Sequence, residues 1–261
     1  MNQGTPIGFF DSGVGGISVL QQTRRLLPAE DYLYFGDSLH APYGVRPVEE
    51  VEILSTRAVE MLLGMGAKAI VIACNTATSA AAASLRRQYP EVPIIGIEPA
   101  LKPAVERHLG GRILVMATAM TLKERKFYDL WKQFDGQAEI VPVPCSGLVE
   151  FVERGILDGD ELEAFLLEKL YPFMKVPVDA VVLGCTHYPF LRPVLRRILG
   201  QRPEILDGAE GVARQLRRQL EQKGLLRMST ESGQVTFLNS HQDPRILELS
   251  QWLMEHSFPG N

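Results

Sequence analysis

The sequence predicts an α/β protein made of two pseudo-symmetric halves, each a mostly parallel sheet flanked by helices, with a functional cleft between them. Short apolar runs alternate with helix-period segments through nearly the whole chain, as in βαβ units. A nine-residue pattern occurs twice, one domain's length apart. The length of 261 residues suits one large domain or two smaller ones, each with its own core.

The first part of the chain predicts four strands and three helices. Residues 48–65 place apolar side chains at 48, 51, 54, 58, 61, 62 and 65, which is one face of a helix, and Gly66 ends it. The residues around it are apolar runs of strand length or helix-period segments. In order, we expect strand 6–10, helix 15–27, strand 31–35, helix 48–65, strand 69–73, helix 76–88 and strand 93–97.

The second part continues the alternation. The segment 95–99, Ile-Gly-Ile-Glu-Pro, is the best candidate for a crossing between domains. After it we expect strand 113–117, helix 121–134, strand 138–143, a helix from 148, helix 160–174, strand 180–183, helix 192–199, strand 204–206, helix 209–223, strand 234–238 and helix 244–256.

Composition narrows the class of protein. Hydrophobic residues make up 46% and charged residues 22%, and the formal charge is -4 without a basic cluster, so no nucleic-acid partner is expected. No uninterrupted apolar run approaches the ~18 residues that span a membrane, and the first residues do not resemble a signal peptide. Three scattered cysteines do not form a disulfide framework, which favours a reducing cytoplasm.

The repeated pattern centres on two cysteines. Residues 68–76 read KAIVIACNT and residues 179–187 read DAVVLGCTH. Each copy is a buried strand that ends in a small residue, a cysteine and two polar residues, with a helix after it. Ligands of parallel sheets bind beyond the carboxyl ends of the strands, so two facing halves would bring Cys74 and Cys185 to one cleft. A helix N-terminus beside each thiol would favour the thiolate.

An alternative is that both cysteines are small buried hydrophobic residues. Their matched settings and polar neighbours favour the functional interpretation. Cys145 lacks such neighbours, and we interpret it as structural.

Other polar residues are expected at the same edge. Asp11 and Ser12 follow the first strand and precede a glycine-rich turn that is neither a dinucleotide fingerprint nor a Walker A loop. These residues, and those after other strands, could equally be helix caps or ordinary turns. The further candidates are Asp37, Ser38, His40 and Tyr43 after the second strand, Thr118 and Thr121 in the second half's counterpart of the Asp11 turn, and His187 after Cys185. The spacing does not suit a metal site.

Two thiols from two halves suggest a different reaction from one thiol. A single activated cysteine beside a histidine is typical of an amidase-like nucleophile. Two opposed cysteines suit inversion of a carbon centre, which needs a base on one face and an acid on the other. A thiol has a reference pKa of ~8.5, so both of its forms are accessible near neutrality. No cofactor is needed for this chemistry.

Four motifs together resemble the glutamate racemase family: FDSGVGG at 10–16, APYG at 41–44, ACNTA at 73–77 and GCTHYPF at 184–190. The resemblance covers essentially the whole chain. It implies cofactor-independent interconversion of L- and D-glutamate, which supplies D-glutamate for peptidoglycan, with the active site between two α/β domains. It also implies that the chain returns to its first domain. The domains would be 1–97 plus 208–261, with Cys74, and 98–207, with Cys185.

The resemblance also implies roles for single residues. Cys74 would remove the α-proton of D-glutamate with help from Asp11, and Cys185 that of L-glutamate with help from His187. Glu153 matches a family acid near the second thiol. The substrate-binding positions would be Asp11, Ser12, Tyr43, Gly44, Asn75, Thr76, Thr118, Thr121, Thr186 and His187. A homodimer is the assembly that the resemblance would lead one to expect.

Three other functions remain open. A racemase for aspartate or another amino acid would use the same motifs, because side-chain length is read by loops. A decarboxylase or isomerase of the same two-cysteine superfamily would often lack one thiol. A non-catalytic binding or inhibitor protein on this fold is the alternative from another class, and glutamate turnover distinguishes it.

Overall fold

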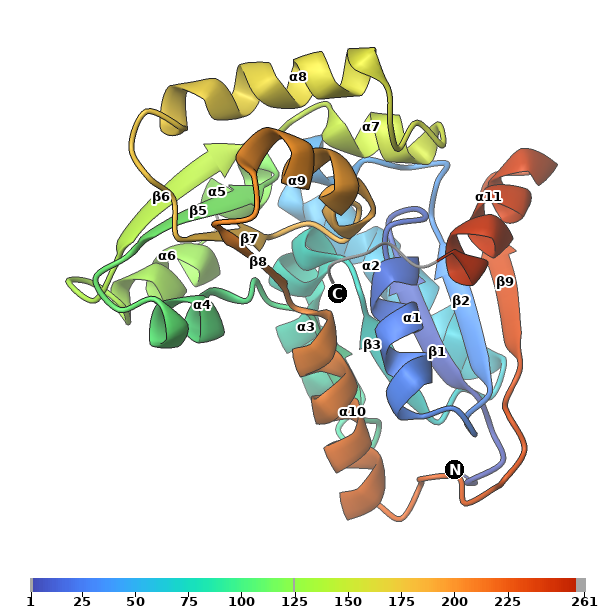
Figure 1. Cartoon of the computed structure of the whole chain (residues 1–261). Helices are drawn as coiled ribbons and strands as arrows, with labels where there is room; N and C mark the ends of the chain where they lie inside the picture. The colour runs from blue at the N-terminus through green and yellow to red at the C-terminus, as the bar shows by residue number, and fades with distance from the viewer. Residues whose placement is uncertain (1, 124, 257–261) are drawn as a thin grey trace.

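The computed structural model describes residues 2–123 and 125–256. Its two parallel sheets, each flanked by helices, confirm the predicted fold class (Figure 1). The first sheet has the order β4-β3-β1-β2-β9 and the second β6-β5-β7-β8. The strands are β1 (Ile7–Asp11), β2 (Tyr32–Gly36), β3 (Ala69–Ile72), β4 (Ile94–Gly96), β5 (Arg112–Ala117), β6 (Glu139–Pro144), β7 (Ala180–Leu183), β8 (Glu204–Asp207) and β9 (Val235–Asn239).

The strand order repeats between the two halves. The run β4-β3-β1-β2 of the first sheet corresponds to β8-β7-β5-β6 of the second. Cys74 follows β3 and Cys185 follows β7, so the two thiols occupy equivalent places. The C-terminal strand β9 pairs with β2 and extends the first sheet, so the chain returns to it after the second. The exact domain boundaries stay a prediction.

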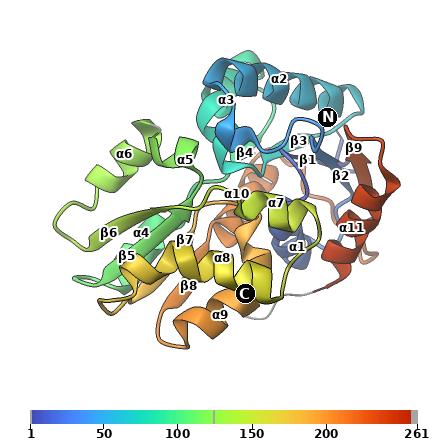
Figure 2. The same ribbon diagram turned by 90° about the horizontal axis from the view of Figure 1, so that it is seen from above.

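Helices cover both faces of the first sheet (Figure 2). Side chains of β1 alternate between those faces, as a strand's period of two requires. Ile7 and Phe9 enter the core under α1, α10 and α11, and Phe10 enters the core under α2 and α3. These helices are α1 (Ile17–Leu26), α2 (Val48–Gly64), α3 (Asn75–Gln88), α10 (Ala209–Gln222) and α11 (Pro244–Glu255).

The second sheet is covered in the same way. Leu114 and Met116 of β5 share a core with α7, α8 and α9, and Val115 faces a core with α4 and α6. The helices are α4 (Leu101–Arg107), α5 (Ala119–Lys123), α6 (Arg125–Lys132), α7 (Leu148–Glu153), α8 (Asp160–Leu170) and α9 (Arg192–Leu199). Among the described residues, none of the helices is both long and apolar enough to cross a membrane.

The clearest differences between prediction and structure concern two predicted helices and one helix that was not predicted. The helix expected over 121–134 is represented by α5, which begins at Ala119, and α6, which ends at Lys132, with residue 124 between them outside the described residues. The Thr118 hydroxyl accepts the Thr121 N–H in the first turn of α5. The helix expected over 160–174 ends at Leu170, where Pro172 introduces a short 3-10 turn. Helix α4 was not predicted. Its Pro103 lies in the first turn, where a helix has no use for the missing N–H.

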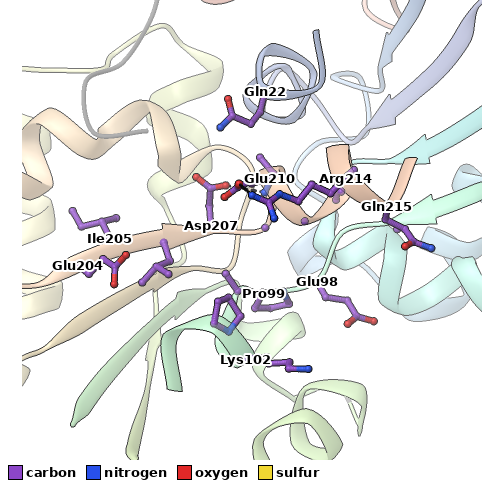
Figure 3. A pocket seen from close by; sticks show the side chains of 18 of the residues that line it. Gln22, Glu98, Pro99, Lys102, Glu204, Ile205, Asp207, Glu210, Arg214 and Gln215 are labelled. Carbon is purple, nitrogen blue, oxygen red and sulfur yellow. Dashed lines mark hydrogen bonds and ion pairs between the residues drawn. The ribbon is translucent and has the colours of Figure 1, made fainter. Parts of the chain in front are cut away.

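The two connections between the halves cross beside a large cavity (Figure 3). Gly208 packs so closely on the first connection that a Cβ there would lie 2.8 Å from Ile97 Cγ1. The cavity has a volume of about 650 Å³, but its lining includes neither Cys74 nor Cys185. Several charged groups of its wall are paired with one another. The pairs are Arg192–Asp207, Arg107–Glu204 and Arg214–Glu210, each at 2.5 Å.

Candidate active site

Cys74 and Cys185 line one cavity between the two halves. They are free thiols, 6% and 8% exposed. The cavity measures about 10 Å³, roughly the room for one water molecule. Its other lining residues are Ser12, Pro42, Gly44, Asn75, Thr76, Thr118, Val149, Gly184, Thr186 and His187. The chemistry-bearing residues therefore surround a far smaller space than the cavity at the crossing.

Cys74 is the N-cap of helix α3. Its sulfur accepts a hydrogen bond from the Ala77 N–H at 3.4 Å. Burial raises the pKa of this thiol to about 12, and the negative charge of Asp11 adds to the rise, against the opposing hydrogen bonds from Ala77 and Ser12. The Ala77 N–H at the helix N-terminus favours the thiolate, as expected, but the net change of the pKa is upward. Removal from water outweighs one N–H donor.

Cys185 lies beside a histidine and an acid. The Cys185 Sγ is 3.7 Å from His187 Nδ1, and His187 Nε2 is 2.6 Å from Glu153 Oε1. Burial opposes a charged imidazole, but the contacts with Cys185 and Glu153 outweigh it and raise the pKa of His187 well above its usual value. A protonated His187 thus places positive charge beside the second sulfur. The two thiols have different electrostatic surroundings despite their equivalent places in the fold.

Asp11 connects the two sides. One carboxylate oxygen accepts the Gly13 N–H and the other accepts the Thr186 hydroxyl, each at 2.9 Å. Burial raises the pKa of Asp11, although the charge of His187 and these hydrogen bonds oppose the rise. Asp11 ends β1 and Thr186 follows β7, so this contact crosses from one half to the other.

The glycines after β1 allow the second half to approach. A Cβ on Gly13 would overlap Glu153 Oε1 and lie 2.6 Å from its Cδ. A Cβ on Gly15 would lie 2.6 Å from His187 Cε1, and one on Gly16 would lie 2.7 Å from Asp11 Cβ. Each of these distances is too short for a real side chain. The turn is glycine-rich because His187 and Glu153 pack directly on its backbone.

Three threonine hydroxyls from both halves meet beside the cavity, and two of the residues, Thr76 and Thr118, line it. Thr76 Oγ1 is 3.5 Å from Thr118 Oγ1 and 3.4 Å from Thr121 Oγ1, and the last two are 3.0 Å apart. Beside them, the buried Oδ1 atom of Asn75 has no hydrogen-bond partner among the described residues. An acceptor without a partner is costly to bury. This wall therefore offers hydroxyl donors and one free acceptor to a ligand.

Most predicted site residues line the cavity, but four lie behind its wall and contact residues around it: Asp11, Tyr43, Thr121 and Glu153. The Tyr43 hydroxyl donates to Asp37 Oδ2 at 2.6 Å, and its side chain is not part of the wall. Gly44 is part of the wall and packs on Thr118. Glu153 lies behind His187, with its side chain 16% exposed.

Sequence reasoning did not select Pro42, Val149 or Gly184 for the cavity wall. Pro42 and Gly184 belong to the APYG and GCTHYPF motifs, but they carry no reactive or polar side-chain group that would predict a place in the wall. Val149, on α7, is an apolar residue outside the four motifs, and nothing in the sequence pointed to it.

A family model gives the first comparison with known proteins. The model described as Asp/Glu/Hydantoin racemase matches residues 14–216. The chain belongs to this family. The matched region includes both cysteines, Glu153 and His187, and begins just after Asp11 and Ser12.

Individual relatives agree with the family. The chain is 51% identical over 250 residues to a glutamate racemase from Clostridium perfringens, covering 96% of both chains. Its fold resembles that of the glutamate racemase isoform RacE1 from Bacillus anthracis, with a TM-score of 0.87, 31% identity, and 98% and 96% coverage. A glutamate racemase from Escherichia coli, solved with L-glutamate and the activator UDP-MurNAc-ala, gives a TM-score of 0.83 at 28% identity, covering 95% of each chain.

Proposed function

We propose that this chain interconverts L- and D-glutamate without a cofactor and supplies D-glutamate for peptidoglycan. The observation that carries the proposal is the pair of thiols, one from each half, at a single cavity. A relative named glutamate racemase is 51% identical over 96% of this chain, which supports glutamate as the substrate.

The two thiols would exchange protons with opposite faces of the α-carbon. In the direction from L- to D-glutamate, the Cys185 thiolate takes the α-proton and the Cys74 thiol donates a proton to the other face. The C–H bond on one face breaks and its electron pair forms the C–H bond on the other. The raised pKa of Cys74 suits a donor, and His187 places positive charge beside Cys185. The product state, with a Cys74 thiolate assisted by Asp11, runs the reverse reaction.

The cavity walls offer complementary groups for an amino acid. The hydroxyls of Thr76, Thr118 and Thr121 would donate to a substrate carboxylate. The free Oδ1 of Asn75 and the carboxylate of Asp11 would accept from the ammonium group. Ser12, Gly44 and Thr186 complete the proposed binding positions, and Tyr43 would act by holding the Gly44 loop through Asp37.

Substrate entry requires the two halves to separate. A space of about 10 Å³ cannot hold glutamate. The halves are joined by two connections that meet at Gly208, so a small rotation there would open the cavity. Closing would then exclude water from the carbanion and hold both thiols against it.

The decisive experiment is proton NMR of L-glutamate and of D-glutamate in deuterated water with the enzyme. We expect loss of the α-proton signal from either enantiomer and, by chiral chromatography, appearance of the other. Cys74→Ser and Cys185→Ser should each abolish racemisation. Cys145→Ser is the matched control, because this buried thiol donates to Val143 O and lies outside the cavity wall. Turnover of aspartate but not glutamate, or of neither, would overturn the proposal.

Two further expectations belong to this proposal. A reducing, cytoplasmic location would keep the two catalytic thiols free, as the cysteines of the structure are. A homodimer remains a prediction from the family resemblance, and sedimentation velocity at several concentrations tests it.

A further inference from the structure

Among the described residues, two of the three hydrogen-bond partners of the Glu153 carboxylate lie in the half of the molecule to which Glu153 does not belong. Glu153 ends α7, which packs in the second half. Its Oε1 accepts the Val14 N–H at 2.8 Å, and its Oε2 accepts the Ser38 hydroxyl at 3.3 Å. Both donors come from the first half. From its own half, the carboxylate contacts His187 Nε2.

Ser38 is itself held in place. The Asn239 side-chain amide, at the end of β9, donates to the Ser38 oxygen at 3.0 Å. Because the Ser38 oxygen accepts from Asn239, its own proton is left to donate, and it donates to Glu153 Oε2. Asn239 is also fixed, because its own Oδ1 accepts the His241 N–H at 2.8 Å. Asn239, at the end of β9, thus orients the Ser38 hydroxyl toward the Glu153 carboxylate of the second half.

These contacts form a continuous series of hydrogen bonds from the first sheet to the Cys185 thiol. It runs from Asn239 through Ser38, Glu153 and His187 to Cys185. The links at Ser38 and at Val14 cross between the halves, so both break when the halves separate. Closing the cavity therefore assembles the acid–base group of Cys185. Cys74 is not a member of this series of contacts: its neighbour Asp11 meets the second half through the Thr186 hydroxyl instead.

We propose that Ser38, oriented by Asn239, is a positioning residue for the Cys185 side of the reaction. It fixes Glu153 on His187 when the halves close, so that proton transfer at Cys185 is efficient only in the closed enzyme. This inference rests on the proposed function. It adds two residues that touch neither the substrate nor a thiol.

Loss of one such hydrogen bond should lower kcat/KM about 3- to 10-fold in Ser38→Ala. Asn239→Ala should have a smaller effect in the same direction. The double variant should be no worse than Ser38→Ala, because Asn239 acts through Ser38. Ser38→Thr, which keeps the hydroxyl, should retain most activity. Ser240→Ala is the matched control, since Ser240 joins the same two segments through the Leu39 N–H without touching Glu153.

Deuterium isotope effects on kcat/KM separate this role from a structural one. Slower transfer at Cys185 should raise the isotope effect for 2-deuterated L-glutamate, whose deuteron Cys185 removes. For 2-deuterated D-glutamate the isotope effect should fall toward one. In that direction Cys74 removes the deuteron, and the slower step that follows is proton donation by Cys185. Equal changes in both directions, or none, would overturn the inference. So would the same asymmetry in Ser240→Ala.

A measurement without substrate keeps the inference testable if glutamate proves not to be the substrate. The ¹⁵N chemical shifts of the His187 ring should titrate differently in Ser38→Ala and in wild type. Identical titration curves would overturn the positioning role. Absence of glutamate turnover in wild type would refute the proposed function alone.

Discussion

Replacing Gly13 by alanine should damage the candidate active site while leaving the fold intact. The new Cβ would overlap Glu153 Oε1 and lie 2.6 Å from its Cδ. The carboxylate is the end of a flexible side chain, so it can move aside at little cost in folding free energy. Moving it breaks the contacts with His187 Nε2 and the Val14 N–H.

The expected loss follows from the charged hydrogen bond to His187. Such a bond is worth about 1.5–3 kcal/mol, which corresponds to a rate decrease of about 10- to 150-fold. The assay is the rate of α-proton loss from L-glutamate in deuterated water, with the thermal unfolding midpoint measured on the same samples. We expect the rate to fall and the midpoint to change by no more than a few degrees.

Two comparisons make the result decisive. Gly64→Ala is the control, because a Cβ there meets nothing within 4 Å and the residue lies in helix α2. In a Glu153→Ala background, Gly13→Ala should cost almost nothing further, since the group it displaces is gone. A Gly13→Ala enzyme with full activity would refute the role assigned to the Glu153–His187 contact. A fully additive double variant would show that Gly13 acts by another route.

Three further predictions concern the thiols, the core and metals. Iodoacetamide should modify Cys74 slowly at neutral pH and faster as the pH rises toward its raised pKa of about 12, because only the thiolate reacts. A rate, followed by peptide mass spectrometry, that is already constant below pH 9 would contradict this. Lys68→Met should lower the free energy of unfolding by about 3–5 kcal/mol in urea titrations, because it leaves the buried Glu30 carboxylate without its cation at 2.5 Å. A loss below about 1 kcal/mol would show that the pair contributes little. Dialysis against EDTA should leave glutamate racemisation unchanged, and a loss that added Zn²⁺ or Mn²⁺ reversed would contradict the cofactor-free mechanism.

Periodicity in the sequence was enough to predict the sheets and most helices. Strand β7 and helix α9 have the predicted bounds, since their apolar runs are short and clearly bordered. Helix α4 was missed because Leu-Lys-Pro looks like a turn, and its first-turn proline is compatible with a helix only in that position.

The place of the two thiols at one cavity was predictable for a different reason. The repeat around Cys74 and Cys185 identified both thiols, because parallel strands place equivalent residues at equivalent edges. The pKa of Cys74 was not predictable. It depends on how deeply the sulfur is buried and on its distance from Asp11, and both follow from packing between segments far apart in the sequence.

By itself, the sequence determined the fold class, the pairing of the two halves and the residue types that can carry a proton. These properties follow from local patterns and from a repeat. Only the tertiary structure decided that the Glu153 carboxylate contacts Val14 and Ser38, and that Gly13 needs to lack a side chain for this contact to form. It also decided that the Oδ1 atom of Asn75 has no hydrogen-bond partner among the described residues. The contacts of Glu153 join segments from opposite halves. Their distances depend on how the two halves pack against each other, and no local sequence pattern predicts that packing.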